Sequence, residues 1–408
     1  MKNRYVQTSG LLGLLLLASP AFSQNYEQIA KQIVNTSAGV KPGELVMITG
    51  GQHTLPLMEA VAVEVARAGG QPNMLLNTDK VAHATSVEMP ESAIQASKSN
   101  DWLLGADVLI QLPSVEDAKT VLAGTTPERQ AKFAKVAAEA GLNKKLDAAK
   151  VRGVFVSYPS KSFAANQQMD YAGYEQMVWA GIGADYTAIA TQAQQLKQLL
   201  ATGKKVHITS PAGTDLTFQL AARPVFVDDG VLTAADQQEK LIYNRTAALP
   251  GGRVYGTNLE TSATGRLVAS PGTWNGKPFQ GFKADFKGGQ MANAKADVGN
   301  EDLQKYLATY DPSVMQLSYF SIGLNPAMKA QEQKGYNPAT AAGMVLVGVG
   351  GNELQGGQNK AATSNGFPIA NATVEVDGQV IVRNGQLVAP TTAKASPGGK
   401  KMQKSGSR

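Results

Sequence analysis

The sequence predicts a two-domain protein, with an α/β domain followed by a β-rich α+β domain. In the first half, segments with helical spacing of apolar residues alternate with short apolar runs, which is typical of a mostly parallel sheet covered by helices. Beyond residue 203, short extended segments separated by Pro, Gly and Asn turns predominate. The chain has 408 residues, of which 43% are hydrophobic, and single cores rarely grow beyond about 250–300 residues. We therefore expect an α/β domain over 24–203 and a β-rich domain over 204–390.

The first residues are typical of a secretory signal peptide. Lys2 and Arg4 precede the apolar run 11–18, and an Ala-x-Ser cleavage site ends at Ser23. The apolar run is too short to span a membrane. We therefore expect 1–23 to be removed and the mature protein to be exported to the periplasm or the exterior, without stable insertion into a membrane.

The expected elements of the first domain alternate along the chain. Helices are predicted at 26–40, 54–67, 91–98 and 127–140, and strands at 44–49, 71–76, 107–112 and 151–158. Thr54 is a typical N-cap, and Gly69-Gly70 is a typical helix stop. Gly50-Gly51 follows the first strand, but neither the G-x-G-x-x-G spacing nor a Walker lysine follows it, so a nucleotide site is not predicted.

A long helical stretch, 171–200, is interrupted near 181–183 and is expected to join the two domains. The second domain is predicted to contain a short helix at 301–307 and strands at 206–209, 215–220, 253–259, 266–269, 282–286, 345–349, 373–376 and 379–382. The last two strands flank Asp377-Gly378, a hairpin turn signal.

Composition excludes several classes of function. The chain has no cysteine, which excludes disulfides, thiolate nucleophiles and thiolate metal sites. The formal charge is +6, but two cationic residues lie in the expected signal peptide and five in the last fifteen residues. The remaining body is close to neutral, which argues against nucleic acid as a partner. Residues 391–408, rich in Gly, Ser, Pro and Lys, are expected to form a basic disordered tail.

Residues 249–268 contain the most distinctive stretch, a Pro-Gly-Gly turn followed by an extended segment, a bend and a second extended segment. Further short sequence motifs occur in the same order as in one known family: Pro42-Gly43-Glu44, Trp102 to Leu112, Ile208 to Leu216, Arg223-Pro224, Asp229-Gly230, Ile322 to Pro326, Gly356 to Asn359 and Val374 to Gly378. Over residues 26–388 the chain thus resembles the metal-dependent aminopeptidases of the aminopeptidase T and S family. The resemblance implies an aminopeptidase T-like fold, a homodimer and two-metal hydrolysis of peptides.

The ligand positions of that family carry other residues in this chain. The resemblance places the family's two glutamates and the histidine of its Gly-Thr-x-His strand at Arg253, Tyr319 and Leu346, and its His-x-Asp pair near Asn365 and Phe367. A guanidinium stays cationic, and a leucine offers no ligand atom, so these residues cannot bind cations as the family does. No metal and no other cofactor is therefore expected. A carboxylate-only site for Ca²⁺ or Mg²⁺ remains an alternative, drawn from Glu260, Asp285, Glu353, Glu375 and Asp377.

Arg253 is the leading candidate for a ligand-binding residue. An arginine at the former metal position can hold a carboxylate or phosphate with two parallel hydrogen bonds. The alternative is that it pairs with Glu260 or Asp285 and fills space. Tyr319 either donates a hydrogen bond to a ligand or belongs to the core. Glu260 either takes part in catalysis or hydrogen-bonds the bend at Ser262.

Two asparagines in Gly-rich turns, Asn325 and Asn365, are further candidates for ligand contacts. His53 lies just past the first strand, at the edge where open α/β sheets bind ligands, although a loop histidine without function is the simpler interpretation. His207 lies inside a predicted strand and is expected to be structural.

Three hypotheses for the function follow. The first is an exported, metal-free pseudo-enzyme that binds a peptide or a small acidic ligand through Arg253. The second is an active exported metalloaminopeptidase with a rearranged pair of divalent metals. The third is a different, metal-free reaction, for which the sequence offers no G-x-S-x-G nucleophile, no cysteine and no His-Glu-x-x-His helix. The first hypothesis fits the residues best.

Overall fold

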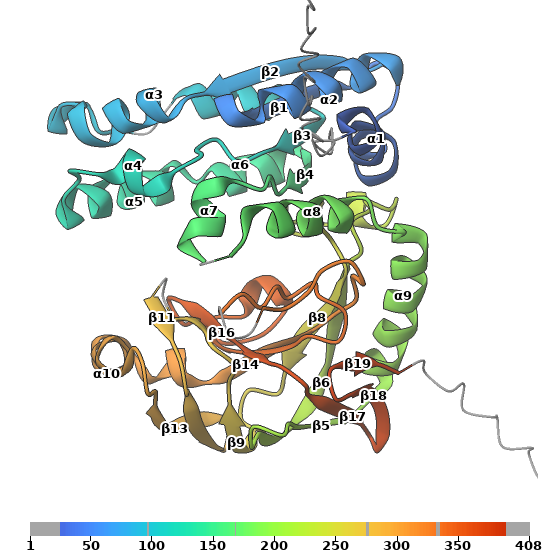
Figure 1. The fold of residues 1–408 in the computed structure, drawn as a ribbon, viewed down its shortest axis with the longest axis vertical. Helices are drawn as coiled ribbons and strands as arrows, with labels where there is room; N and C mark the ends of the chain where they lie inside the picture. The colour runs from blue at the N-terminus through green and yellow to red at the C-terminus, as the bar shows by residue number, and fades with distance from the viewer. Residues whose placement is uncertain (1–24, 96–97, 168, 275–276, 332–334, 389–408) are drawn as a thin grey trace, which may run out of the picture.

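The computed structural model describes residues 25–95, 98–167, 169–274, 277–331 and 335–388. A parallel sheet with helices occupies the first half of the chain, and a large antiparallel sheet lies below it (Figure 1). The predicted fold class is therefore confirmed. No helix of the described ranges is long and apolar enough to cross a membrane. The predicted signal peptide and basic tail lie outside the described residues.

The parallel sheet has the strand order β2-β1-β3-β4-β7. Its strands are β1 (Leu45–Gly51), β2 (Gln71–Asn77), β3 (Val108–Gln111), β4 (Arg152–Val156) and β7 (Thr246–Leu249). Val46 and Ile48 of β1 are fully buried on the face that α2 (Leu55–Arg67) covers with Leu57 and Val61. This is the apolar run of a strand buried in an α/β sheet, as predicted.

The helices of the first half, besides α2, are α1 (Tyr26–Lys31, continued by a π-helical segment Gln32–Ala38), α3 (Asp79–His83), α4 (Ala118–Leu122), α5 (Pro127–Ala140), α6 (Leu142–Ala149), α7 (Lys161–Asn166), α8 (Tyr171–Ile182) and α9 (Tyr186–Thr202). The helix predicted at 91–98 is wrong, because the described residues there form only a short turn, Glu91–Ala93, and the start of a separate 3-10 segment, Lys98–Gly105. The helical residues lie earlier, where Thr78 caps α3 by accepting a hydrogen bond from the Val81 N–H.

The antiparallel sheet has a main path in the order β16-β15-β14-β8-β6-β5-β17-β18-β19, and β9, β12 and β13 pair beside it. Its strands are β5 (Lys205–Thr209), β6 (Asp215–Asp228), β8 (Arg253–Asn258), β9 (Thr264–Val268), β12 (Lys283–Lys287), β13 (Gln290–Lys295), β14 (Leu317–Gly323), β15 (Val345–Gly350), β16 (Ser364–Ile369), β17 (Thr373–Val376), β18 (Gln379–Arg383) and β19 (Gln386–Leu387). A separate hairpin, β10 (Gly272–Trp274) with β11 (Lys277–Phe279), and one helix, α10 (Asn300–Thr309), complete this half.

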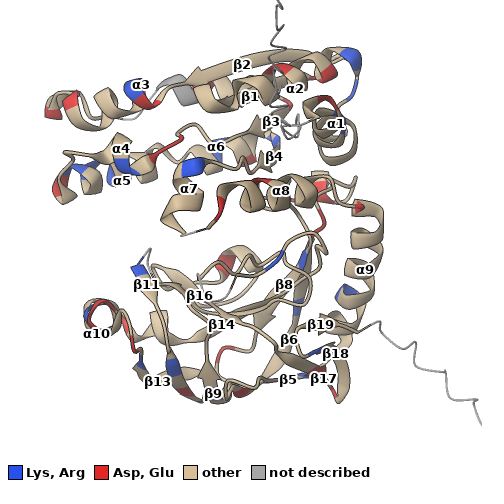
Figure 2. Cartoon of the chain, in the orientation of Figure 1, with Lys and Arg blue, Asp and Glu red and all other residues tan. Residues whose placement is uncertain are grey.

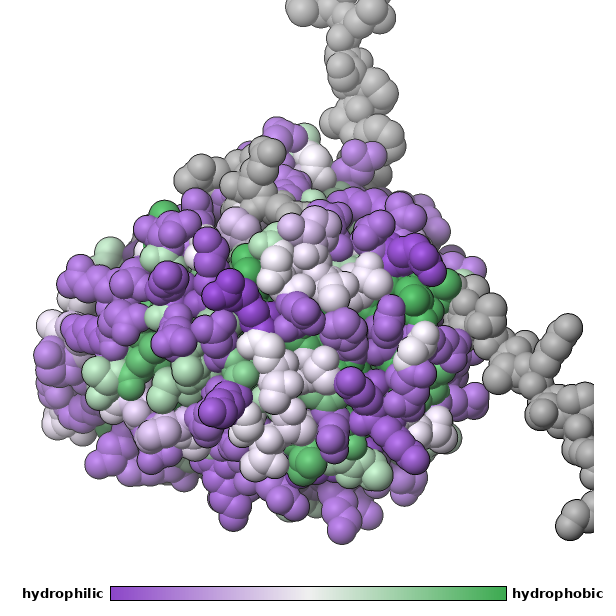
Figure 3. Space-filling model, turned by 90° about the horizontal axis from the view of Figure 1, so that it is seen from below, coloured by the Kyte–Doolittle hydropathy of each residue, from purple (hydrophilic) through white to green (hydrophobic). Residues whose placement is uncertain are grey.

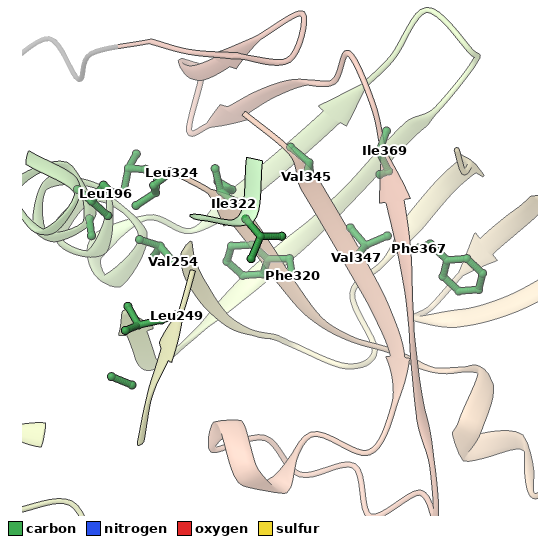
Figure 4. Close-up of a cluster of buried hydrophobic side chains, with 14 of the residues drawn as sticks. Leu196, Leu249, Val254, Phe320, Ile322, Leu324, Val345, Val347, Phe367 and Ile369 are labelled. Atoms are coloured by element: carbon green, nitrogen blue, oxygen red, sulfur yellow. The ribbon is translucent and has the colours of Figure 1, made fainter. Parts of the chain in front are cut away.

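One face of this sheet forms its core. Phe320 and Ile322 of β14 lie beside Val345 and Val347 of β15, and none of these side chains is more than 2% exposed (Figure 4). Because side chains alternate along a strand, Tyr319 and its alternate neighbours project from the opposite face. That opposite face carries Arg253, Tyr319 and Leu346, where the family resemblance places three of its metal ligands, whereas Asn365 and Phe367 lie on the core face.

Strand β7 belongs to the first sheet, although its residues fall within the range 204–390 expected for the second domain. The chain leaves the first sheet after β4, forms α7 to α9, β5 and β6, and returns at Thr246 to pair in parallel with β4. The long route leaves part of the sheet face formed by β3, β4 and β7 without a covering helix. Phe155, in the inner strand β4, is accordingly 44% exposed.

A buried arginine holds the loop that returns to β7. Arg245 is 1% exposed, and its guanidinium donates hydrogen bonds to the carbonyls of Val151 (3.1 Å), Leu146 (3.1 Å), Glu239 (2.6 Å) and Lys240 (2.7 Å). Leu146 lies in α6, whose carboxyl end carries partial negative charge. The guanidinium thus fastens the loop to the helix and the sheet.

The outer surface is polar and carries both signs of charge. On the face seen from below, hydrophilic residues predominate and hydrophobic residues form small separate patches (Figure 3). Lys and Arg are interspersed with Asp and Glu over both halves of the molecule (Figure 2).

Candidate functional site

The pairing of β6 with β8 brings an ion pair and an aromatic pair onto one face of the antiparallel sheet. Asp228 lies opposite Arg253, and Phe226 lies opposite Tyr255. Directly opposite residues share a face and interact. The Nε of Arg253 donates to Oδ2 of Asp228 over 3.2 Å. Arg253 therefore does have a carboxylate partner, but the partner is neither of the two that the sequence suggested.

The guanidinium of Arg253 retains capacity for a further partner. Its Nε is used by Asp228, whereas within the described ranges its two terminal nitrogens have no hydrogen-bond or ion-pair partner. The guanidinium carbon lies 4.9 Å from the centre of the Tyr255 ring, and the Phe226 and Tyr255 rings are stacked with centres 5.5 Å apart. The side chain is 31% exposed. The terminal N–H groups are thus positioned by an ion pair and a ring while open to a ligand.

These four residues line a cavity of about 750 Å³. Leu109, Gln111, Gly153, Thr246 and Ala248, from strands β3, β4 and β7 of the first sheet, line it as well. Further lining residues come from α9 and from the loop between β6 and β7. The cavity exists because the chain leaves and re-enters the first sheet around it. Its size is that of a small-molecule site.

Burial controls the protonation of the groups around the cavity. It raises the pKa of Asp228, and the charge of Arg253 opposes this effect. Burial raises the pKa of Asp229 to about 6 and that of Tyr319 to about 12. Burial also raises the pKa of Tyr255. At neutral pH both tyrosines are therefore protonated, and the Tyr255 hydroxyl is already hydrogen-bonded to Tyr243.

The raised pKa of Asp229 predicts a dependence of stability on pH. The folded pKa of Asp229, about 6, exceeds the ordinary value of 3.8. The contribution of its protonated carboxyl group to stability is therefore greatest below pH 3.8 and is lost as the pH rises through 6. Asp229→Asn should therefore be more stable than the wild type at pH 7 by on the order of 1–3 kcal/mol, with little difference at pH 3.5. Urea unfolding at both pH values measures this. A difference that does not change with pH would contradict it.

Tyr319 lies on the same sheet face as Arg253 but outside the residues that line the cavity. It is opposite Gly348 on β15, where any larger side chain would overlap the tyrosine ring. Tyr319 thus packs over a glycine-lined part of the sheet, which favours the packing interpretation over a ligand contact.

The donor set at the family's metal positions does not fit a cation. Arg253, Tyr319 and Leu346 project from one face of β8, β14 and β15, since Arg253 pairs with Gly323 and Leu346 pairs with Ser321. Arg253 is cationic, Tyr319 is a protonated phenol and Leu346 is a hydrocarbon, so none of them supplies a metal ligand. Within the described part of the chain no three His, Cys, Asp or Glu residues are grouped so as to hold a metal ion.

Glu260 is fully engaged in a structural network. Its carboxylate accepts two hydrogen bonds from Arg223, over 2.5 and 2.8 Å, one from Asn352 over 3.0 Å and one from the Gln358 N–H over 2.9 Å. Burial by itself would raise its pKa, but these hydrogen bonds hold the pKa at about 2. Glu260 is therefore a poor general base. It fastens residues 352–358 to the end of β8.

The two asparagines predicted to contact a ligand lie away from the cavity. Asn325 is fully buried, and its Nδ2 donates to the carbonyls of Gly181 (3.0 Å) and Gly251 (2.8 Å). It holds the turn before β8 against α8. Asn365 projects from the other face of β16, where its Nδ2 donates to the Tyr306 hydroxyl over 3.2 Å. Neither residue lines the Arg253 cavity.

The remaining carboxylate candidates are scattered over the second half. Asp285 pairs with Arg266 over 3.2 Å, Glu353 lies 3.9 Å from Lys360, and Asp377 accepts the N–H groups of Lys204 and Lys205. Glu375 lies opposite His207 in the β17–β5 pair. The structure thus does not gather them into the carboxylate-only site considered above.

The histidines have local partners. His207 Nε2 lies 2.8 Å from Oδ1 of Asp215, which agrees with a structural role. His53 lies at the end of β1 with its ring edge-on to Tyr158, and burial lowers its pKa.

Sequence reasoning missed Asp228, Phe226 and Tyr255 as site residues. The signal was present, because in the run from Pro224 to Asp228 the valines alternate with Phe226 and Asp228, which places the last two on one face of a strand. What the sequence did not show is the register that sets Asp228 opposite Arg253.

Comparisons with known proteins agree with this architecture. The family model described as thermophilic metalloprotease (M29) matches residues 22–336. Among solved structures, wild-type AmpT from Thermus thermophilus has a TM-score of 0.72 at 19% identity, covering 90% of this chain and 100% of that chain. The structure of 2,5-dihydroxypyridine dioxygenase from Pseudomonas putida KT2440 has a TM-score of 0.56 at 16% identity, covering 90% and 97%.

A curated relative is a 2,5-dihydroxypyridine 5,6-dioxygenase from Pseudomonas putida, 25% identical over 211 residues. The match covers 48% of this chain and 58% of that protein, so the chain spans a little more than half the length of the curated relative. At these identities the similarity to the solved structures establishes the fold alone.

Proposed function

The chain belongs to the thermophilic metalloprotease (M29) family, and from this premise we propose that it is an exported, metal-free member that binds a peptide or a small acidic ligand in the Arg253 cavity. The observation that carries the proposal is the guanidinium of Arg253. It lies at the position that the resemblance assigns to a metal-binding glutamate, lines a cavity of about 750 Å³ and has two terminal nitrogens without a partner in the described ranges.

The chemistry of the surrounding groups supports an anion. The guanidinium presents parallel N–H donors that match a carboxylate. Tyr255 beside it remains protonated at neutral pH, so it adds no negative charge next to the guanidinium. A bound cation would be repelled by the fixed positive charge of Arg253. Asp228 neutralises that charge but leaves no excess negative charge at this position for a cation.

Export and assembly are part of the proposal. The basic residues, apolar run and Ala-x-Ser site before Gln24 support export through a cleaved signal peptide. The family resemblance supports a homodimer. The interspersion of Lys and Arg with Asp and Glu over both halves supports a partner other than nucleic acid (Figure 2).

A second candidate is an active exported metalloaminopeptidase with a rearranged metal pair. The match to a metalloprotease family over residues 22–336 favours it. A dioxygenase shares the fold as well, which is consistent with this fold supporting more than one chemistry.

Metal content and peptide release separate the two candidates. We expect the mature protein, purified without chelator, to contain far less than one zinc, cobalt or manganese ion per chain by elemental analysis. We also expect no release of N-terminal residues from a mixed peptide pool when each metal is added. About two metals per chain with metal-stimulated release would contradict the proposal and establish the second candidate.

A further inference from the structure

The Arg253 cavity has distinct chemical regions that restrict the ligand further. Its charged lining residues are three cations, Lys197, Arg223 and Arg253, and four acids, Asp228, Asp229, Asp236 and Glu239. Because the acids outnumber the cations by four to three, the cavity does not favour a ligand with several negative charges. Arg223 is already held by Glu260. A single negative charge can be accepted at Arg253, whose terminal nitrogens have no partner in the described ranges.

The surface next to Arg253 is aromatic. Phe226 and Tyr255 are stacked on each other with an interplanar angle of 21° and ring centres 5.5 Å apart, and the guanidinium lies over the Tyr255 ring. Both residues line the cavity, so a ligand ring can pack against this stacked pair, the Phe226–Tyr255 platform. The same residues thus offer a ring contact and an anion contact side by side.

The part of the lining contributed by the first sheet and α6 includes apolar residues. These are Leu109, Leu142, Leu146 and Ala248, and they lie among the polar residues Gln111, Asn143 and Thr246. A ligand that contacts both the Phe226–Tyr255 platform and this wall needs an apolar body.

We propose that the ligand of this cavity is a planar aromatic monocarboxylic acid, with its carboxylate on the terminal nitrogens of Arg253 and its ring on the Phe226–Tyr255 platform. This inference rests on the proposed binding function and narrows its ligand class. It distinguishes the ligand from inorganic or organic phosphates, which carry more charge, and from aliphatic acids, which lack a π-face.

The test is isothermal titration calorimetry of the whole mature chain with benzoate, cyclohexanecarboxylate and inorganic phosphate. Benzoate should bind, and cyclohexanecarboxylate, which has the same charge and similar size, should bind roughly three- to tenfold more weakly for lack of ring stacking. Phosphate should give no measurable heat. Tyr255→Leu should bring the two carboxylates to about equal affinity while leaving phosphate unbound.

The anion contact is tested with a paired substitution, because Arg253→Gln alone would leave Asp228 buried without its partner. The double variant Asp228→Asn with Arg253→Gln should weaken benzoate binding roughly tenfold or more. Arg266→Gln with Asp285→Asn is the matched control, since it removes an ion pair with the same 3.2 Å geometry between neighbouring strands β9 and β12, outside the cavity. This control should bind benzoate as the wild type does. Circular dichroism checks that each variant is folded.

The outcomes separate the two levels of the proposal. If both carboxylates bind equally and the Asp228–Arg253 double variant loses both, the aromatic class is overturned and the binding function stands. If phosphate binds better than benzoate, the single-charge inference is overturned. If no anion binds, or if the folded double variant binds as well as the wild type, the proposed function itself is overturned.

Discussion

Replacing Arg245 by methionine is expected to lower the free energy of unfolding by more than about 3 kcal/mol. The guanidinium is 1% exposed and donates to the carbonyls of Val151, Leu146, Glu239 and Lys240. Methionine fills part of the space but donates nothing, so buried carbonyls lose charge-assisted hydrogen bonds worth roughly 1.5–3 kcal/mol each. The loss also frees the loop that lines the cavity from the end of α6.

Urea unfolding followed by circular dichroism measures this cost. Arg266→Met is the control, because Arg266 is 60% exposed and forms a surface ion pair with Asp285. Exposed pairs contribute roughly 0–1 kcal/mol. Equal destabilisation by the two substitutions would show that the hydrogen bonds of Arg245 do not hold the fold together as described.

Arg223→Met is expected to cost roughly 3–5 kcal/mol at pH 7, because it leaves the carboxylate of Glu260 buried without its cation. The side chains of Arg223 and Glu260 are 12% and 9% exposed. In the wild type the pKa of Glu260 is held at about 2, below its ordinary 4.5. A depressed pKa contributes stability that is present above about 4.5 and lost as pH falls towards 2.

The pH dependence identifies the cause of the expected loss. Without Arg223, burial dominates and raises the pKa of Glu260, so the carboxylate takes up a proton at a higher pH than in the wild type. The deficit of Arg223→Met should therefore shrink as pH falls from 7 to 4. The double variant Arg223→Met with Glu260→Leu should be more stable than the single variant at pH 7. A double variant that is worse than the single one would refute this account.

The sequence predicted those helices whose ends are set by capping residues next to them in the chain. The helix predicted at 127–140 is found with the same bounds, because Thr126 accepts a hydrogen bond from the Arg129 N–H and Gly141 adopts a φ of 59° at the other end. By contrast, β14 was not predicted as a strand, because Ser318 and Ser321 interrupt the apolar residues of Leu317–Gly323 without a regular alternation.

The site was only half predictable for the same reason. Arg253 could be proposed from the sequence because it replaces a glutamate in a recognisable turn and strand. Its partner Asp228 lies on another strand, and a one-residue change in the β6–β8 register would turn that carboxylate to the other face. The same alternation of faces affects Asn365. Its neighbour Gly366 shares the sheet face of Gly348, so Asn365 projects from the opposite face. The cavity depends on the uncovered face of a sheet in the other half of the chain, which no local pattern encodes.

The return of β7 to the first sheet has a consequence for synthesis. Strand β4 keeps one open edge until Thr246–Leu249 has been made, because β7 is its parallel partner on that side. Open strand edges are where growing chains pair wrongly with one another. A nascent chain that extends only to residue 203 lacks β7, and its first sheet is therefore incomplete. A truncated product ending there should be prone to aggregation, and neither half is a natural unit to express by itself.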